Sequence, residues 1–182
     1  MADAASIDTE RFLTFTLAGE LFAIAITSVR EILDMAEITR IPQMPPAMRG
    51  VVNVRGAAVP VIDLRLRFGL EAAERTVNTR IIIVEISTGD DTITLGAVAD
   101  SVKEVLELDA ANIAPVPAMG VAVNTAFLRG IGKCNGRFIL LLDIGKVLHS
   151  DEIFMLDEVS RSLNDVSVIE GQAAAATTIP AQ

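Results

Sequence analysis

Short runs in which apolar and polar residues alternate dominate the chain up to about residue 150, and this period of two is typical of β-strands. Residues 12–17 form one such run, and residues 21–26 form the next after a turn that contains Gly. A second pair of apolar runs, 80–86 and 92–98, flanks the sequence Ser-Thr-Gly-Asp-Asp. The pattern therefore predicts two β-hairpins, one near the N-terminus and one in the middle of the chain.

The chain also contains an internal repeat. Four residues of the first half recur 80 positions later: Arg49, Gly50, Gly56 and Asp63 match Arg129, Gly130, Gly136 and Asp143. A segment of the form Ser-Val-basic-Glu, which starts at Ser28, recurs 73 positions later at Ser101. Each half therefore runs in the same order through a hairpin, this segment, a proline-containing connection, Arg-Gly and a strand that ends in Asp.

Each half has about 70 residues and five short strands, which bury their apolar faces most readily by curling into a small barrel. We therefore predict a mainly β fold with two five-stranded barrels, at roughly residues 10–75 and 76–150, around a shared core. Both belong to a single domain over residues 10–163. Because duplicated halves can exchange strands across a common interface, the limits of the two barrels stay provisional.

Helices are expected to be few and short. They are predicted at 109–113, as a turn at 145–148, and at 152–163 near the C-terminus. The spacing of Ser28 and Glu31 also fits a capping box, as does that of Ser101 and Glu104. We expect residues 1–9 to be flexible and residues 164–182, which include an Ala-rich stretch, to be a disordered tail.

Composition and charge exclude several functions. With a net charge of -9 and a pI near 4.6, the surface is a poor match for nucleic-acid phosphates, and no Trp or Tyr is available for base stacking. No apolar run approaches the roughly 18 residues that span a bilayer, so we expect a cytoplasmic protein without membrane insertion. Cys134 is the sole cysteine, which rules out an internal disulfide and a cysteine metal site. We expect no cofactor and no metal.

Few residues are candidates for catalysis. His149 is the only histidine and has no evident partner. Asp63 and Asp143 hold equivalent positions and could meet near a pseudo-twofold axis, which gives a carboxylate-dependent hydrolase as a remote alternative. Each Asp, however, closes an apolar strand before a helix-like turn, where its carboxylate can cap free amides, and the Asp-Thr/Ser-Gly signature of acid proteases is missing. We therefore favour capping roles and predict that the protein is not an enzyme.

The region around Gly50 and Gly56 separates into structural and functional parts. The two glycines lack the Gly-Lys-Ser/Thr ending of a phosphate loop, so we expect them to provide positive φ angles or close backbone approach. Arg55 differs, because Asn135 stands at its repeat position. A charge kept in one half only is better placed for a partner than for architecture, the alternative being a solvated surface arginine.

Five segments carry a resemblance to a known family: Val29-Arg-Glu-Ile32, Arg40-Ile-Pro42, Arg49-Gly-Val-Val-Asn-Val-Arg-Gly56, Val59-Pro-Val-Ile-Asp-Leu-Arg65 and Phe68-Gly69. With Asn-x-Arg-Gly followed by Pro-x-x-Asp-Leu-Arg as the most specific signature, the chain resembles the CheW family of bacterial chemotaxis coupling proteins over about residues 10–156. The resemblance implies two SH3-like five-stranded subdomains around a common core, in agreement with the barrels inferred from the repeat.

The resemblance also implies a function and partners. Members of this family are non-catalytic adaptors that join the cytoplasmic tip of methyl-accepting chemotaxis receptors to the regulatory domain of the histidine kinase CheA. We therefore expect recruitment to receptor arrays in the cytoplasm, and rings that include further copies of the protein are left open. An adaptor of a related sensory array for motility, surface attachment or development is the alternative, and the sequence does not separate the two.

Site residues are carried over from the family by position. The resemblance places a receptor groove at Val29, Glu31, Arg55 and Gly56, and it links Gly50, Gly96 and Val105 to kinase coupling. Because the receptor tip is a long helical hairpin, we expect a helix laid into an apolar groove with a polar rim. We further predict that Glu31 and Arg55 form an ion pair at this groove. Val29 and Ile32 would both suit the groove, with core packing as the alternative, and for Ile32 we favour the core.

Overall fold

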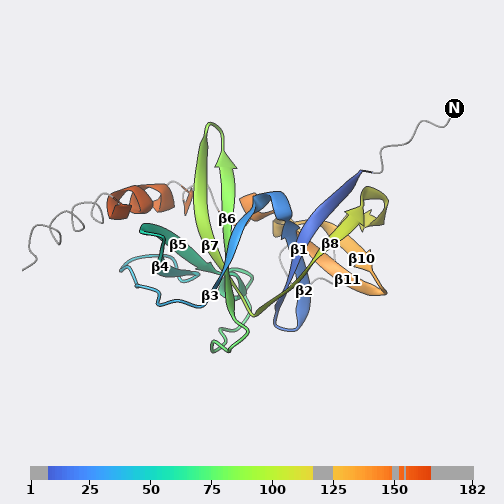
Figure 1. Cartoon of the computed structure of the whole chain (residues 1–182), viewed down its shortest axis with the longest axis horizontal. Coiled ribbons are helices and arrows are strands. Elements are labelled where there is room, and N and C mark those ends of the chain that lie inside the picture. Colours follow the sequence, from blue (N-terminus) through green and yellow to red (C-terminus); the bar gives the residue numbers. More distant parts are fainter. Residues whose placement is uncertain (1–7, 117–124, 149–151, 154, 165–182) are drawn as a thin grey trace, which may run out of the picture.

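The computed structural model describes residues 8–116, 125–148, 152–153 and 155–164. Two curled β-sheets lie side by side, and the C-terminal helix extends along one end of the molecule (Figure 1). His149 and the predicted tail from residue 165 onward lie outside the described residues, as does the predicted flexible N-terminus up to residue 7. Strand β1 already begins at Thr9, and the described part of the C-terminal helix runs to Asn164.

Sheet A has six strands in the order β8-β1-β2-β11-β10-β9. Its strands are β1 (Thr9–Leu17), β2 (Glu20–Ala25), β8 (Ser101–Asp109), β9 (Ile113–Ala114), β10 (Leu128–Cys134) and β11 (Arg137–Leu142). Sheet B has the order β3-β6-β7-β5-β4. Its strands are β3 (Val29–Asp34), β4 (Met48–Val54), β5 (Ala57–Asp63), β6 (Arg80–Thr88) and β7 (Asp91–Ala99).

The two sheets are not built from contiguous halves, because the halves exchange their hairpins. The hairpin β1–β2 pairs with β8 and β11 of the second half, and the hairpin β6–β7 pairs with β3 and β5 of the first half. The junctions are equivalent: β2 and β11 are parallel, and so are β7 and β5. Each sheet therefore contains one copy of every repeated element, but its hairpin comes from the other half.

Five short helical segments connect the strands: η1 (Ile26–Ser28), α1 (Leu64–Arg67), η2 (Ala110–Asn112), η3 (Thr125–Phe127) and η4 (Ile144–Lys146). Residues 152–153 and 155–164 are helical as well. The predicted helix at 109–113 is the single 3-10 turn η2, whose first amides are capped by Asp109. The C-terminal helix lies where the sequence predicts it, and none of the helices in the described ranges is long and apolar enough to cross a membrane.

A shared apolar core joins the two sheets. Four phenylalanine rings form a continuous stack through it: Phe15 and Phe22 of sheet A lie 6.0 Å apart, Phe68 follows at 5.8 Å and Phe127 at 5.3 Å. Each sheet also has a smaller cluster of its own. Since aromatic rings contribute large buried areas, this stack helps to hold the two sheets together.

Two equivalent glycines allow the outermost segment of each sheet to approach closely. A Cβ on Gly50 would lie 2.0 Å from the carbonyl oxygen of Thr39, and a Cβ on Gly130 would lie 2.8 Å from Ile113. Both glycines sit at a β-bulge, and Gly50 has a φ of 136°. The prediction that Gly50 provides close backbone approach is confirmed.

Candidate functional site

Arg55 occupies a tight turn that disfavours it. The hairpin β4–β5 turns through Arg55 and Gly56 with φ angles of 53° and 87°, and the equivalent hairpin β10–β11 turns through Asn135 and Gly136 with 51° and 78°. Two consecutive positive φ angles define the hairpin turn in which Asn-Gly is preferred, because Asn tolerates the left-handed region better than other side chains. The fold alone would therefore favour Asn at position 55, and Arg is retained at a conformational cost.

The predicted ion pair between Arg55 and Glu31 is present. A terminal nitrogen of Arg55 lies 3.2 Å from Oε2 of Glu31, and the Arg55 side chain is 81% exposed, against 20% for Glu31. An exposed pair of this kind contributes only about 0 to 1 kcal/mol to stability. Its main effect is to fix the direction of the guanidinium, which stays open to solvent.

The capping-box interpretation of Glu31 and Glu104 is wrong. Glu31 lies in strand β3 and Glu104 in strand β8, so neither follows a helix N-cap. The backbone of Glu104 instead pairs with the hydroxyl of Thr14, which accepts from its amide at 3.0 Å and donates to its carbonyl at 2.7 Å. The apolar and polar residues around each Ser-x-x-Glu segment alternate with the period of a strand, and this longer pattern decided the structure.

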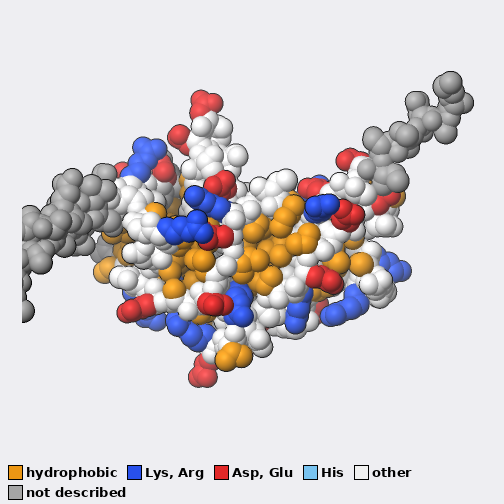
Figure 2. All heavy atoms as spheres, in the orientation of Figure 1, with side chains coloured by type: hydrophobic (Ala, Val, Ile, Leu, Met, Phe, Trp, Pro, Cys, Tyr) orange, Lys and Arg blue, Asp and Glu red, His pale blue; other side chains and the backbone are white. Residues whose placement is uncertain are grey.

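Ile32 is exposed, and the prediction that it packs in the core is also wrong. Along β3 the side chains alternate, so that Val29, Glu31 and Leu33 are half-buried while Ile32 is 41% exposed. Val105 holds the equivalent position on β8 and is 49% exposed. Both strands lie at a sheet edge. Figure 2 shows apolar side chains gathered on the surface between β3 and β1, with charged groups around them.

The C-terminal helix forms part of the same region, which the sequence did not indicate. A cavity of about 280 Å³ is bordered by Glu31 and Arg55 on one side and by Ser160 and Asn164 of the helix on the other. The helix is attached to Ala58 of β5, whose amide donates to Asn164 Oδ1 at 2.8 Å and whose carbonyl accepts from Ser160 Oγ at 3.3 Å. A helix 106 positions away from Ala58 in the chain gives no local signal for this contact.

Several predicted site residues lie on one line across sheet B. Glu31 is in register with Ile83, Ile83 with Gly96, Gly96 with Val61, and Val61 with Gly50. Gly96 is enclosed, since a Cβ there would lie 3.0 Å from Ile81 and 3.3 Å from Val61.

Other predicted positions lie away from this line. Val105 belongs to sheet A. Gly56 is exposed in the Arg55 turn, where its amide donates to Asn53 Oδ1 at 2.8 Å. Val29 is half-buried and packs against the shared core. The residues predicted for the receptor and those predicted for the kinase therefore do not form two separate patches in this structure.

Asp63 and Asp143 are helix caps. Asp63 accepts from the amides of Arg65 and Leu66, at 3.0 and 3.4 Å, and its buried carboxylate also receives Nε of Arg49 at 3.0 Å. Asp143 accepts from the amide of Gly145 at 3.2 Å. They border different cavities. Both carboxylates are used by the fold, which confirms the capping interpretation and opposes the hydrolase alternative.

A further ion pair joins α1 to the residue that follows β7. Arg65 donates to both carboxylate oxygens of Asp100, at 2.7 and 2.5 Å, and this bond raises the pKa of Arg65. Burial alone would raise the pKa of Asp100, but the hydrogen bonds from Arg65 and from the amide of Ala18 outweigh it and lower that pKa. Among the described residues, no group of His, Cys, Asp and Glu could hold a metal ion.

The fold and the site together define a mainly β protein in which two sheets with exchanged hairpins share one core. The CheW-like domain family matches residues 11–152. "Chemotaxis protein CheW" of Klebsiella aerogenes is 37% identical over 153 residues, which cover 84% of this chain and 90% of that protein. The crystal structure of the scaffolding protein TtCheW from Thermoanaerobacter tengcongensis superposes with a TM-score of 0.71 at 34% identity, over 79% of this chain and 90% of that one.

A more distant relative has a different name. "Protein FrzA" of Myxococcus xanthus is 30% identical over 143 residues, which cover 78% of this chain and 86% of that protein. The chain described here belongs to the CheW family, and it is a non-catalytic coupling adaptor of chemotaxis. The sequence-based predictions of the family and of the mainly β fold are confirmed.

Proposed function

We propose that this adaptor joins the cytoplasmic tip of methyl-accepting chemotaxis receptors to the regulatory domain of the histidine kinase CheA, within receptor arrays in the cytoplasm. The observation that carries the proposal is Arg55. It is kept in a turn that favours Asn, it is 81% exposed, and it is oriented by Glu31. A residue retained against the preference of its own backbone is better explained by a partner than by the fold.

The receptor surface is proposed to comprise Val29, Glu31, Arg55 and Gly56. An amphipathic receptor helix would place its apolar side on the surface between the two sheets, and its polar side would meet Arg55. The apolar side chains seen between β3 and β1 in Figure 2, with charged residues at their margin, support this arrangement. Because the net charge of the protein is -9, the exposed positive charge of Arg55 stands out from the overall charge of the chain.

Kinase coupling is proposed to depend on Gly50, Gly96 and Val105. Two of these residues are backbone constraints within sheet B, in register with Glu31. A larger side chain at Gly96 would displace Ile81 or Val61 and so shift the strands that carry the receptor residues. Val105 differs because it is an exposed apolar side chain on an edge strand, and it fits direct contact with the kinase.

The test is co-sedimentation of the protein with receptor fragments and CheA, with kinase activity as the readout. Arg55→Glu should reduce receptor binding by about tenfold or more, since it places a repelled charge at the interface. The double variant Arg55→Glu with Glu31→Arg restores the pair in reverse and should still fail to bind. Recovery of binding in the double variant would show that only the pair matters and would contradict direct contact by Arg55.

A matched control is available on sheet A. Arg11 and Glu107 form an exposed ion pair at 2.9 Å, so Arg11→Glu makes the same change of charge at a pair outside the four proposed receptor residues. Binding should be unchanged in this variant. If the folded wild-type protein binds neither the receptor fragments nor the kinase, the coupling proposal is wrong.

An adaptor of a related sensory array is the second candidate, and the similarity to the protein named FrzA favours it. The same assay separates the two proposals when it includes a kinase from a chemotaxis array and one from an array that controls another behaviour. Activation of the second kinase alone would assign the protein to that array. Further copies of the protein in array rings would be detected as sedimenting assemblies that form without the kinase.

A further inference from the structure

A cavity of about 520 Å³ lies at the edge of sheet B, away from Arg55. Its wall combines segments that are distant in the sequence: the connection after β3, the start of β4, helix α1 and the loop between α1 and β6. Four arginines line it, namely Arg40, Arg49, Arg65 and Arg75. In a chain with 15 basic and 24 acidic residues, this is a marked local excess of guanidinium groups.

Two of the four guanidinium groups have no acidic partner among the described residues. Within the described part of the chain, Arg40 and Arg75 form no ion pair, and both are exposed. Arg49 gives only its Nε to Asp63, and its two terminal nitrogens form no hydrogen bond among the described residues. Arg65 is fully engaged by Asp100 and by the carbonyl of Glu71. Arg40, Arg49 and Arg75 can therefore donate to a bound group.

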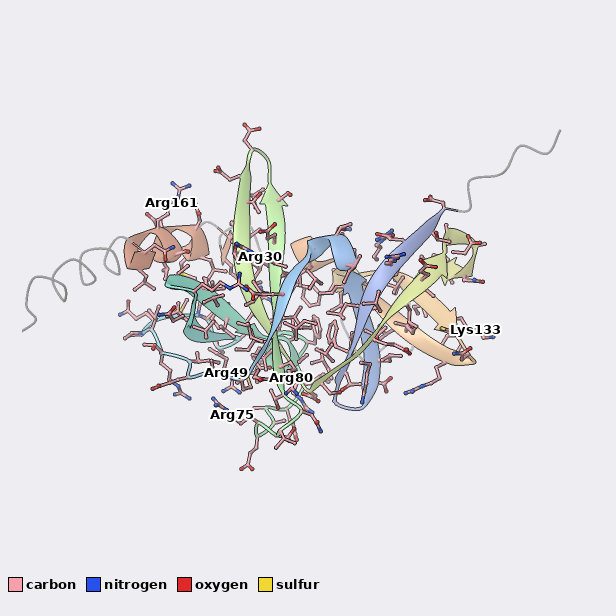
Figure 3. The ribbon with its side chains drawn as sticks, in the orientation of Figure 1. Arg30, Arg49, Arg75, Arg80, Lys133 and Arg161 are labelled. Carbon is pink, nitrogen blue, oxygen red and sulfur yellow. The ribbon has the colours of Figure 1, made fainter. Side chains whose placement is uncertain are left out.

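The acidic residues of the cavity do not cancel this charge. The carboxylate of Asp63 already accepts hydrogen bonds from Arg49 and from the two capped amides. That of Asp100 accepts them from Arg65 and from the amide of Ala18. Only Glu74, on the outer loop, remains without an ion pair in the described residues. Figure 3 shows Arg49 and Arg75 at the same edge of the sheet.

The repeat preserves Arg49 as Arg129, which pairs with Glu10, but it does not preserve Arg65. A cavity of about 390 Å³ adjoins the equivalent helix cap in the other half, where Asp143 corresponds to Asp63 and Gly145 to Arg65. No arginine lines it, and Glu85 contributes an acidic group instead. The same helix cap is thus built without an arginine at the position of Arg65, and Arg40 and Arg75 form no ion pair in the described residues that would give them a structural role.

We infer that this cavity binds a small anion that carries two or more phosphate groups. Phosphate oxygens point in several directions and can receive guanidinium groups from three separate segments, whereas a carboxylate is planar and satisfies one or two. Met35, Ile38 and Val98 give the wall an aliphatic side, and no aromatic ring lines the cavity to stack a base. The ligand is therefore a phosphorylated compound recognised through its phosphates.

The probe is pyrophosphate, titrated into the full chain by isothermal calorimetry, with citrate as a second anion. We expect saturable binding of pyrophosphate at one site and a rise in melting temperature, because a ligand that binds only the folded state stabilises it. The double variant Arg40→Gln with Arg75→Gln should weaken binding by about tenfold or more. Both side chains are exposed and unpaired, so the variant should melt like the wild type.

The control removes the same charge elsewhere. Lys133→Gln with Arg137→Gln changes two exposed residues of the β10–β11 hairpin in sheet A and should leave the affinity for pyrophosphate unchanged. Absence of saturable binding to the wild type, or an equal loss in the control, would overturn the inference. Equal affinity for citrate would overturn its assignment to phosphate. The assay contains neither receptor nor kinase, so its result is independent of the coupling proposal.

Discussion

Two equivalent hairpins of this protein, β4–β5 and β10–β11, have the same turn backbone and different side chains. In β10–β11 the turn is Asn135-Gly136, which its left-handed φ angles favour; in β4–β5 it is Arg55-Gly56, which they do not. The helices capped by Asp63 and Asp143 differ in the same way, because Arg65 lies two positions after the cap in one half and Gly145 lies there in the other. The duplication thus separates residues that the fold needs in both copies from residues kept in one copy for another purpose.

The largest expected change in stability comes from substituting the two glycines at the β-bulges, and it should differ between them. Gly50→Ala places a Cβ 2.0 Å from a backbone oxygen at a φ of 136°, and neither the neighbour nor the torsion can yield cheaply. We expect a loss of about 3 kcal/mol or more in the free energy of unfolding. In Gly130→Ala the nearest atom belongs to the side chain of Ile113, so the loss should be smaller. Urea denaturation of both variants measures the difference, and equal losses would contradict this explanation.

The two helix caps should also differ in strength. Asp63→Ala removes a buried carboxylate that receives Arg49 and two amides, and we expect a loss of about 2 to 4 kcal/mol. Asp143 is more exposed and accepts one amide, so Asp143→Ala should cost about 1 kcal/mol. Thermal melts compare the pair. A cost at Asp143 as large as that at Asp63 would show that the ion pair with Arg49 adds nothing.

Exchange of the turn residues sharpens the contrast between the hairpins. Arg55→Asn relieves the left-handed turn, and the gain should match or slightly exceed the loss of the Glu31 pair, leaving stability unchanged or higher by up to about 1 kcal/mol. Asn135→Arg should lower stability by about 1 kcal/mol. Only Arg55→Asn should impair receptor binding. A destabilised Arg55→Asn variant would instead make the arginine structural.

The smallest expected effect is on the stability of the protein at low pH. The pKa of Asp100 is lower in the folded chain, so its contribution to stability is present above the unfolded value of about 3.9 and is lost as the pH falls through the folded value. Thr27 stands at the equivalent place and has no such group. Asp100→Asn should therefore flatten the decline of stability below about pH 4, by less than about 1 kcal/mol. Acid titration followed by circular dichroism measures it, and an unchanged slope would contradict the assignment.

Local sequence patterns predicted the strands and hairpins, and comparison of the two repeated halves separated structural residues from candidate binding residues. Both hairpins, the Asp caps and the isolation of Arg55 followed from alternation and from comparing the halves. The exchange of strands between the halves stayed an open possibility, because either hairpin satisfies the same register and nothing local selects the partner sheet. The exposure of Ile32 depended on which face of β3 is buried. The arginine cavity was hidden because Arg40, Arg49 and Arg75 meet only in the folded chain.

The exchanged hairpins bear on the history of the chain. A single half-length chain could complete neither sheet with its own hairpin in this arrangement, and two copies would have to trade hairpins to do so. The present topology is what fusion of such a swapped dimer would leave behind. Because one chain carries both copies, each turn and cavity can differ from its counterpart, which is not possible in a symmetric pair of identical chains.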